Sequence, residues 1–375
     1  MRRFCVEGRA DLICGVCSGC RSASTGALFY LNLHDGGMCM RASAIGLALL
    51  ATAALPAVGN DTTAELSTGG LVFVRNDNIE MQSEELAIST EEVTVRYRFL
   101  NKSDRDVTLL VAFPMPDIHV EGPDDVVSVP TNDPVNVLGF TTFVEGKPVG
   151  TSVEQRAIAM GIDRTQMLRA LGIPLAPHLA TTNETLDRLL PDNWDEFLRL
   201  GLAEVEEYDT GHGMIRHLAA RWTLQTTYYW EQTFPAGAAT VVEHRYHPSV
   251  GASVQTALGS PDQAKEPWFD EYKSKYCLES EFLAAVERER KTAHSKFGAP
   301  FAEQRIDYIL KTGANWSGPI KEFRLLVDKG EPDNLASFCG EDAKPLEDTK
   351  YEMVKTDYTP DGNLSILILK KLPQH

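Results

Sequence analysis

Several segments of this chain alternate apolar and polar residues with a period of two, and this pattern restricts the fold more than any other sequence feature. Residues 93–99 place Val, Val, Tyr and Phe at alternate positions, with Thr and Arg between them. Successive side chains of a β-strand point to opposite faces, so this segment predicts a strand with one buried and one solvated face. The segment 222–234 extends the pattern, with one face formed by Trp222, Leu224, Tyr228, Trp230 and Phe234.

Turn signals follow both segments and predict how the strands connect. The polar run 101–104 precedes an apolar run at 107–113, and Pro235-Ala236-Gly237 precedes another at 241–246. We therefore predict two antiparallel hairpins, each formed by the strands on either side of a turn. A helix is expected from Cys277 through Val286. Further strands are expected at 140–144, 149–153, 305–310, 323–327, 335–338 and 364–369.

The period changes near residue 161, where the sequence begins to favour short helices. Asp163, Thr181 and Asp192 are each placed to begin or cap a helix. Together they predict a three-helix insertion at about 156–215. Strands and helices do not alternate regularly elsewhere, so the predicted fold is mainly β. We expect β-sandwich-like antiparallel sheets interrupted by this short helical segment, and not an alternating α/β sheet.

An export signal is expected within the first 60 residues. Arg41 supplies a positive charge, residues 45–55 are apolar, and Ala57-Val58-Gly59 offers small side chains to a signal peptidase. A membrane-spanning helix needs about 20 apolar residues, so a cleaved signal peptide at 38–59 is favoured over an anchor. Asn60 is then the expected first residue of the mature chain. An alternative cleavage site lies at Ala51-Thr52-Ala53.

Residues 1–37 precede this signal and show no clear periodicity. We interpret them as a non-native or untranslated extension, and expect Met38 or Met40 to be the true start. The mature chain, 60–375, should form a single domain that is periplasmic or secreted. The extension has a cysteine spacing similar to that of an iron–sulfur ligand run, at Cys14, Cys17 and Cys20. The fourth cysteine of such a run is missing, so discarded sequence is the better interpretation.

The charge of the chain restricts its partners. The full sequence carries a formal charge of −17, and removing residues 1–59, with five arginines and three acids, leaves about −19. Nucleic acid and anionic lipid both bind through Lys and Arg, so we expect neither a nucleic-acid partner nor membrane insertion after signal removal. An envelope protein or a small ligand is the expected partner.

Cys277 and Cys339 are the only cysteines after the predicted signal. An even number of cysteines in an oxidising compartment predicts one disulfide, Cys277–Cys339. Two separate buried thiols are the alternative.

Histidines are the first residues to test for metal or catalytic chemistry. His244 and His247 lie three apart in a predicted strand, so they point to opposite faces and cannot share an ion without a bulge. His212 and His217, near Asp209, match no zinc spacing. The sequence therefore predicts no metal site and no cofactor.

Nucleophiles and acidic clusters give no stronger signal. Ser249-Val250-Gly251 lacks the glycine that a nucleophile elbow needs two places before the serine. Acidic pairs such as Glu84-Glu85 lack the ordered oxygen ligands of a calcium loop, so we expect them to form a solvated surface.

Aromatic residues are dense at Tyr228, Tyr229 and Trp230, where alternation places Tyr229 opposite the other two. These side chains are expected in the sandwich core. A ligand groove between sandwich and helices is the alternative, suited to an apolar or carbohydrate ligand or to another envelope protein.

Motifs spread over the expected mature chain resemble the bacterial family catalogued as domain of unknown function 4424. They are Asn60–Glu65, Gly69–Phe73, Val95–Asn101, Phe113–Pro116, Trp230–Gly237, His244–Gly251, Asn315–Ile320 and Asp328–Gly330. Residues 1–37 have no counterpart in that pattern. The resemblance implies an exported, chiefly β protein of uncharacterised role, and it supplies no catalytic residues.

We therefore expect an exported protein that acts as a non-enzymatic binding or interaction module. The alternative is an envelope hydrolase whose site is assembled from distant residues such as His244, Asp209 and Glu231, because catalytic groups are defined by space and not by sequence order. That alternative predicts that at least two of the three side chains converge in a pocket.

Overall fold

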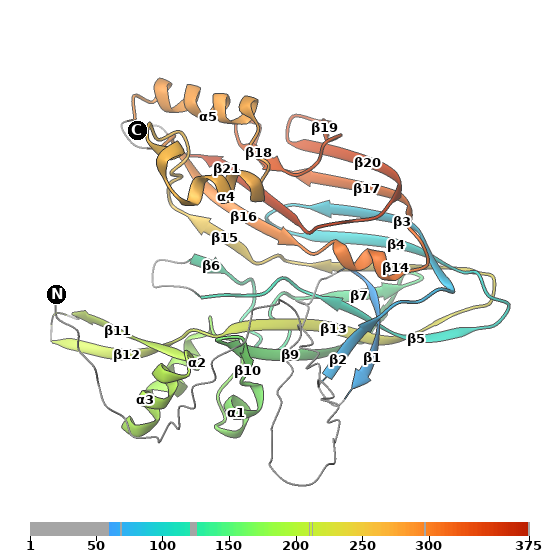
Figure 1. The fold of residues 1–375 in the computed structure, drawn as a ribbon, viewed down its shortest axis with the longest axis horizontal. Helices are drawn as coiled ribbons and strands as arrows, with labels where there is room; N and C mark the ends of the chain where they lie inside the picture. Colours follow the sequence, from blue (N-terminus) through green and yellow to red (C-terminus); the bar gives the residue numbers. More distant parts are fainter. Residues whose placement is uncertain are drawn as a thin grey trace, which may run out of the picture. The chain divides into compact units, whose positions relative to one another are not determined.

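The computed structural model describes residues 60–67, 70–120, 126–209, 211, 213–295 and 298–373. The predicted extension at 1–37 and the predicted signal peptide at 38–59 lie outside the described residues. The described residues belong to one compact unit, and three sheets supply most of its framework (Figure 1). In the described part of the chain, no helix is both long and apolar enough to cross a membrane.

The first sheet has six strands in the order β10-β9-β13-β5-β1-β2. Its neighbouring strands are all antiparallel. In chain order they are β1 (Thr62–Ser67), β2 (Gly70–Val74), β5 (Val107–Pro114), β9 (Ser152–Ala159), β10 (Ile162–Asp163) and β13 (Thr223–Phe234).

The second sheet has eight strands in the order β19-β20-β17-β3-β4-β14-β7-β8, and its β3–β17 pair is parallel. The strands are β3 (Ile79–Ile88), β4 (Val93–Asn101), β7 (Thr141–Val144), β8 (Lys147–Val149), β14 (Ala239–Tyr246), β17 (Ile320–Asp328), β19 (Lys344–Pro345) and β20 (Lys350–Tyr358).

The third sheet has five strands in the order β18-β21-β16-β15-β6. They are β6 (Val126–Ser128), β15 (Val250–Ser253), β16 (Phe301–Tyr308), β18 (Leu335–Phe338) and β21 (Leu364–Lys371). Its strand β21 is buried on both faces: Ile366 and Ile368 join the main core, whereas Leu367 and Leu369 pack in a second core. The second core includes residues of α4 (Trp268–Lys275) and α5 (Ser280–Thr292), which lie along this sheet in Figure 1.

The predicted hairpins are wrong, although the predicted strands are present. Strand β4 pairs with β3 and β14, whereas β5 pairs with β1 and β13, so each turn carries the chain from one sheet to the other. The two crossovers bond to each other at buried Asn101, whose N–H donates to Ala238 O (3.1 Å) and whose Nδ2 donates to Phe234 O (2.9 Å). Alternation fixes which face of a strand is buried but not which strand lies beside it.

The six- and eight-stranded sheets pack face to face through the predicted alternating residues. Phe99 of β4 contacts Phe234 of β13 with ring centroids 5.8 Å apart, and both side chains are fully buried. The mainly β, sandwich-like fold class is therefore confirmed. The main core extends over residues of all three sheets.

The three predicted helices are present, within narrower bounds than 156–215. They are α1 (Thr165–Ala170), α2 (Ala180–Asp187) and α3 (Pro191–Arg199). Residues before and after them form β9, β10 and a two-stranded hairpin of β11 (Ala203–Asp209) and β12 (Met214–Ala220). The predicted starts differ by one or two residues: Pro191, for example, is the first residue of α3 because its fixed φ suits that position. Two short 3₁₀ helices complete the fold, η1 (Gln263–Lys265) and η2 (Lys311–Asn315).

The predicted disulfide is confirmed. Cys277 and Cys339 are bonded, and they join the residues that follow α4 to those that follow β18. Ser337 Oγ donates to Tyr276 O (2.9 Å) beside the bridge, so the joined segments are also tied by a hydrogen bond.

Replacing both cysteines by serine should lower the free energy of unfolding by about 4 kcal/mol, because the bridge closes a long loop in the unfolded chain. Denaturant unfolding monitored by far-ultraviolet circular dichroism measures this change. Wild-type protein unfolded with a reductant is the matched control and should behave like the double variant. Equal midpoints for oxidised wild type and double variant would show that the bridge does not stabilise the fold.

Candidate functional site

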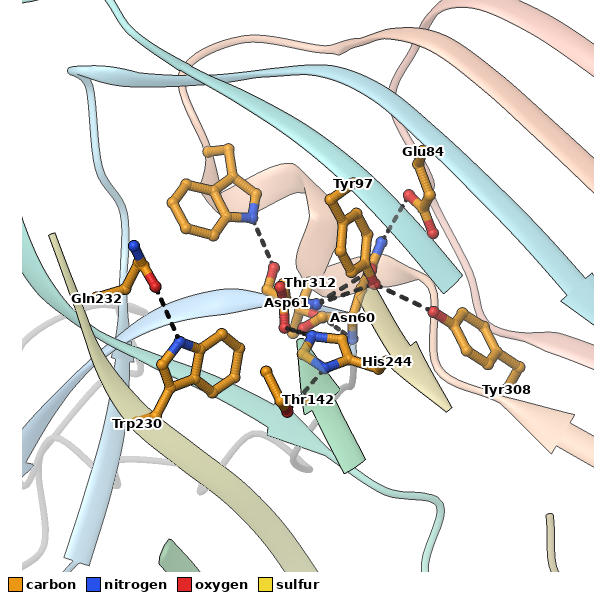
Figure 2. A network of polar contacts seen from close by, with 11 residues as sticks. Asn60, Asp61, Glu84, Tyr97, Thr142, Trp230, Gln232, His244, Tyr308 and Thr312 are labelled. Carbon is orange, nitrogen blue, oxygen red and sulfur yellow. Dashed lines mark hydrogen bonds and ion pairs between the residues drawn. The ribbon is translucent and has the colours of Figure 1, made fainter. Parts of the chain in front are cut away.

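The densest group of polar side chains lies inside the core, between the sheets (Figure 2). It includes two carboxyl groups, one imidazole and two phenols, and no member is more than 2% exposed. We call it the buried polar network: Asn60, Asp61, Glu84, Tyr97, Thr142, His244, Tyr308, Thr312 and Trp316.

Strand register places four of the nine network residues on the inner face of the eight-stranded sheet. Glu84 of β3 lies directly opposite Tyr97 of β4, and Thr142 of β7 lies directly opposite His244 of β14. Directly opposed residues share a face of the sheet. All four side chains therefore point into the space that the six-stranded sheet closes from the other side.

The burial of Glu84 overturns the prediction of a solvated acidic pair at Glu84-Glu85. The register between β3 and β4 shifts between Met81 and Ser83, so one extra residue is inserted in β3. A bulge reverses the alternation of the residues that follow it. Ile79 and Met81 face inward before the bulge, and after it Glu84 is fully buried while Glu85 is exposed.

His244 is held between two hydrogen-bond partners. Its Nε2 lies 3.0 Å from Asp61 Oδ1, and its Nδ1 lies 3.0 Å from Thr142 Oγ1. Figure 2 shows this chain of hydroxyl, imidazole and carboxylate side by side. The same three kinds of group, in the same order, form the nucleophile, base and acid of many hydrolases.

The side chains around His244 leave no room for a substrate beside it. Its ring centroid lies 5.0 Å from those of Phe113 and Phe140 and 5.1 Å from that of Trp230, while Thr142 is 2% exposed. A nucleophile must reach the reacting atom of a substrate at about 3 Å. Enclosed in this way, the Thr142–His244–Asp61 chain acts as a structural link between the N-terminal segment and the sheet.

Asn60 connects the rest of the network. Its Nδ2 donates to Glu84 Oε2 (2.9 Å), and its Oδ1 accepts a hydrogen bond from the Tyr97 hydroxyl. Its main-chain N–H donates to Thr312 Oγ1, and that hydroxyl in turn donates to Asn60 O (2.7 Å). The Tyr97 and Tyr308 hydroxyls are 3.3 Å apart, which extends the network to the five-stranded sheet.

Asp61 is fixed through its backbone as well as its side chain. The Trp316 indole Nε1–H donates to Asp61 O (2.6 Å), and the next residues pair with β5, beginning with Thr62 opposite Ala112. Both Trp316 and Thr312 lie about 250 positions further along the sequence than the residues they bind. The N-terminal segment is therefore enclosed by elements from both halves of the chain.

Burial is the largest influence on the pKa values of the two acidic groups, Asp61 and Glu84. It raises the pKa of Asp61 above its usual value, an effect that His244 partly offsets. Burial also raises the pKa of Glu84 to about 8, with the hydrogen bond from Asn60 opposing the shift and the charge of Asp61 adding to it. The pKa values of Tyr97 and Tyr308 are both well above the usual range for the same reason.

The other residues proposed for a hydrolase do not lie beside His244. Asp209 is exposed at the end of β11, where its Oδ1 accepts from Gly211 N (2.8 Å), and Glu231 is exposed on β13. His244 instead contacts Asp61, which the sequence analysis did not consider. The hydrolase alternative predicted that at least two of His244, Asp209 and Glu231 converge in a pocket. The structure does not bring these three side chains together.

His247 and His217 are separate from the network. His247 follows the end of β14, is exposed, and has its Nδ1 2.6 Å from Glu91 O, so it does point away from His244. His217 of β12 has its Nδ1 2.6 Å from Asp187 Oδ2 of α2. His212 lies outside the described residues. Within the described ranges, no three His, Cys, Asp or Glu side chains are grouped to hold a metal ion.

The aromatic run divides as the alternation predicted. Tyr228 and Trp230 are core residues, 1% and 4% exposed, and the Tyr228 hydroxyl donates to Asn136 Oδ1 (2.8 Å). Tyr229, on the other face of β13, is half-buried. Of the three residues proposed for a groove, it is therefore the one that a ligand could reach, and ligand binding there stays a prediction.

Two cavities lie away from the network. One, of about 560 Å³, is lined by the residues Asp270, Lys273, Ser274, Cys277, Leu278, Glu279 and Ser280. The other, of about 540 Å³, is lined by Gln255, Thr256, Ala257, Ser260, Pro261, Asp262 and Gly298. Neither includes a residue of the buried polar network.

These observations define a class of protein: a multi-sheet β protein with a network of titratable side chains enclosed in its core. The chain belongs to the family described as Domain of unknown function (DUF4424), whose model matches residues 59–367. The sequence resemblance is thereby confirmed. The family description assigns no activity.

Comparison with curated proteins and solved structures gives no further indication of function. No curated protein matches the chain. A solved structure from Legionella pneumophila, titled as a candidate nutrient binding protein, is 17% identical with a TM-score of 0.39. The match covers 83% of this chain and 70% of that one, but so low a TM-score carries no argument about fold or function.

A His244→Ala variant should lose about 2–4 kcal/mol of unfolding free energy, because it leaves Asp61 and Thr142 buried without their partner. Thermal or denaturant unfolding measures the loss. His247→Ala is the matched control: this exposed histidine lies three residues away and should leave stability unchanged. A His244→Ala protein as stable as wild type would contradict the structural role of the Asp61–His244 pair.

Proposed function

We propose that this protein is exported, loses residues 1–59, and acts outside the cytoplasm as a non-enzymatic module that binds another envelope protein. The predicted export signal, the strongly acidic composition of residues 60–375 and the Cys277–Cys339 disulfide support this location. The enclosure of the Thr142–His244–Asp61 chain favours binding over hydrolysis, because that chain is the arrangement most similar to a catalytic one.

The observation that carries the binding proposal is the distribution of exposed apolar side chains. Thirteen large apolar residues are exposed in the described parts of the chain, and seven of them fall within the segment 160–215. A contiguous exposed apolar patch is typical of an interaction surface, and we propose that these seven side chains form one. We call these seven the insertion surface: Met160, Ile162, Leu171, Leu190, Leu198, Met214 and Ile215.

The elements that carry the insertion surface lie together. Helices α1–α3 and the β11–β12 hairpin are grouped beside β9 and β13 in Figure 1, and helix α2 packs on β12 and α3 on β11. The side chain of Met160 lies close to Gly201, in the turn after α3. A Cβ atom added at Gly201 would be only 2.7 Å from Met160 Cγ.

Polar contacts fix the base of the β11–β12 hairpin. Arg221 binds Glu204 (3.0 Å) and Glu206 (2.8 Å), and Asp187 Oδ1 accepts from Leu218 N (2.8 Å). The far end instead exposes Met214 (62%) and Ile215 (40%). A fixed base with an apolar outer end is suited to inserting into a partner, since little conformational entropy remains to be lost on binding.

Site-specific photo-crosslinking in living cells tests the proposal. A photoreactive residue at Met214 or Leu190 should give discrete adducts with one envelope protein, and Ile215→Ser should weaken them. The same group at Val354, which is 56% exposed on β20, is the matched control and should give none. Equal adducts at all three positions, or turnover of a screened substrate with none, would contradict the binding proposal.

A further inference from the structure

The buried polar network is short of hydrogen-bond donors where it surrounds Asn60. Among the described buried side chains, Glu84 Oε1 and Asp61 Oδ2 have no hydrogen-bond partner. Both carboxyl groups are fully buried, and the one basic side chain among the network residues is His244. A buried carboxylate without a compensating donor or charge is strongly unfavourable.

The main-chain nitrogen of Asn60 lies at this place. It donates to Thr312 Oγ1, and the side chain of the same residue binds Glu84 Oε2 at 2.9 Å. The next residue in the chain is Asp61, so this nitrogen belongs to a residue that is hydrogen-bonded to one of the two carboxyl groups through its side chain and precedes the other. As part of a peptide bond, this nitrogen is uncharged and offers one N–H.

We propose that the α-amino group of Asn60, freed when the Gly59–Asn60 bond is cleaved, remains in this site as an ammonium and forms a buried ion pair with the Glu84 and Asp61 carboxylates. The inference rests on the export and processing proposed above. Cleavage would therefore complete the core as well as remove the signal.

The chemistry of cleavage supplies what the network lacks. Water adds its hydroxyl to the Gly59 carbonyl carbon and a proton to the Asn60 nitrogen as the C–N bond breaks. The free amine takes one further proton from solvent, because an α-amino group has a pKa of about 7.7–8.0 even without a nearby carboxylate. The nitrogen then has three N–H donors and a positive charge, so it keeps Thr312 and gains donors for the carboxylates.

Cleavage should also change how stability depends on pH. While the peptide bond is intact, burial holds the pKa of Glu84 near 8, so this group stabilises the fold fully below its unfolded pKa of about 4.5, and the contribution is lost as pH rises through about 8. An ammonium beside Glu84 lowers its pKa and removes much of that loss. The titratable groups that face Glu84 are Asp61, Tyr97, Tyr308 and Tyr358, with His244 on the far side of Asp61.

The direct test is the reactivity of the Asn60 amine in protein isolated from the periplasm. Mass spectrometry first establishes the N-terminal residue. Acetylation with N-hydroxysuccinimidyl acetate at neutral pH is then timed in buffer and in denaturant, and the peptides are quantified. The Asn60 amine should react at least about tenfold more slowly in the folded protein, as expected for a group exposed only by opening of the core. Lys147 is exposed and serves as the internal control.

A pair of neighbouring variants separates the ion pair from burial alone. Glu84→Gln keeps the shape of the side chain but removes its charge, so it should speed native acetylation of the Asn60 amine several-fold. Glu85→Gln, on the exposed face of the same strand, should have no effect. Equal acetylation rates in wild type and Glu84→Gln would overturn the ion pair, whether or not the amine is protected.

The outcomes distinguish this inference from the proposed function. A periplasmic chain that begins at Asn60 but is acetylated at the unfolded rate overturns the buried ammonium and leaves export and binding unaffected. A periplasmic chain that begins at another residue overturns the inference together with the proposed cleavage site. Protein that keeps Met1 and stays in the cytoplasm overturns the export on which both depend.

Discussion

The contact between Asp61 and His244 is the interaction on which the rest of this structure depends. A carboxyl group and an imidazole are placed 3.0 Å apart with no solvent access, and each is costly to bury alone. Each therefore requires the other, and the pairing fixes the start of β1 against β14. Strand β1 then pairs with β5 in the six-stranded sheet. The Asp61–His244 contact therefore joins the six-stranded sheet to the eight-stranded sheet through a polar interaction within an apolar core.

The same constraint explains why the most reactive side chains give no evidence of catalysis. A histidine between a hydroxyl and a carboxylate has the composition of a catalytic chain, but here aromatic rings surround it and the hydroxyl faces the core. Buried polar groups of this kind restrict how the core can pack, because few alternative packings keep the Thr142–His244–Asp61 and Asn60–Glu84 hydrogen bonds. The features that face solvent, above all the β11–β12 hairpin and α3, are those available to a partner.

Much of the fold could be predicted from the sequence, because alternation reports burial directly. The strands at 93–99 and 222–234 and the helices after residue 161 follow from local patterns, and the Cys277–Cys339 bridge follows from the number of cysteines after the predicted signal. The strand partners could not be predicted: both proposed hairpins are crossovers, and their hydrogen bonds join residues more than 130 positions apart, as from Asn101 to Phe234. Glu84 was wrongly assigned to a solvated acidic surface because acidic side chains are usually exposed, although Leu86 and Ile88, which share its face of β3, already indicated a buried face. The buried polar network joins residues about 250 positions apart, and no spacing rule contains that information.

Asn60 and Asp61 are part of the core and not a loose end attached to it. Native-state hydrogen exchange of the Trp316 indole Nε1–H, which donates to Asp61 O, tests this most directly. This proton should exchange only through global unfolding, with the same free energy as the slowest amides of β4 and β14. Exchange through a local opening of much lower free energy, while those strands stay protected, would contradict it.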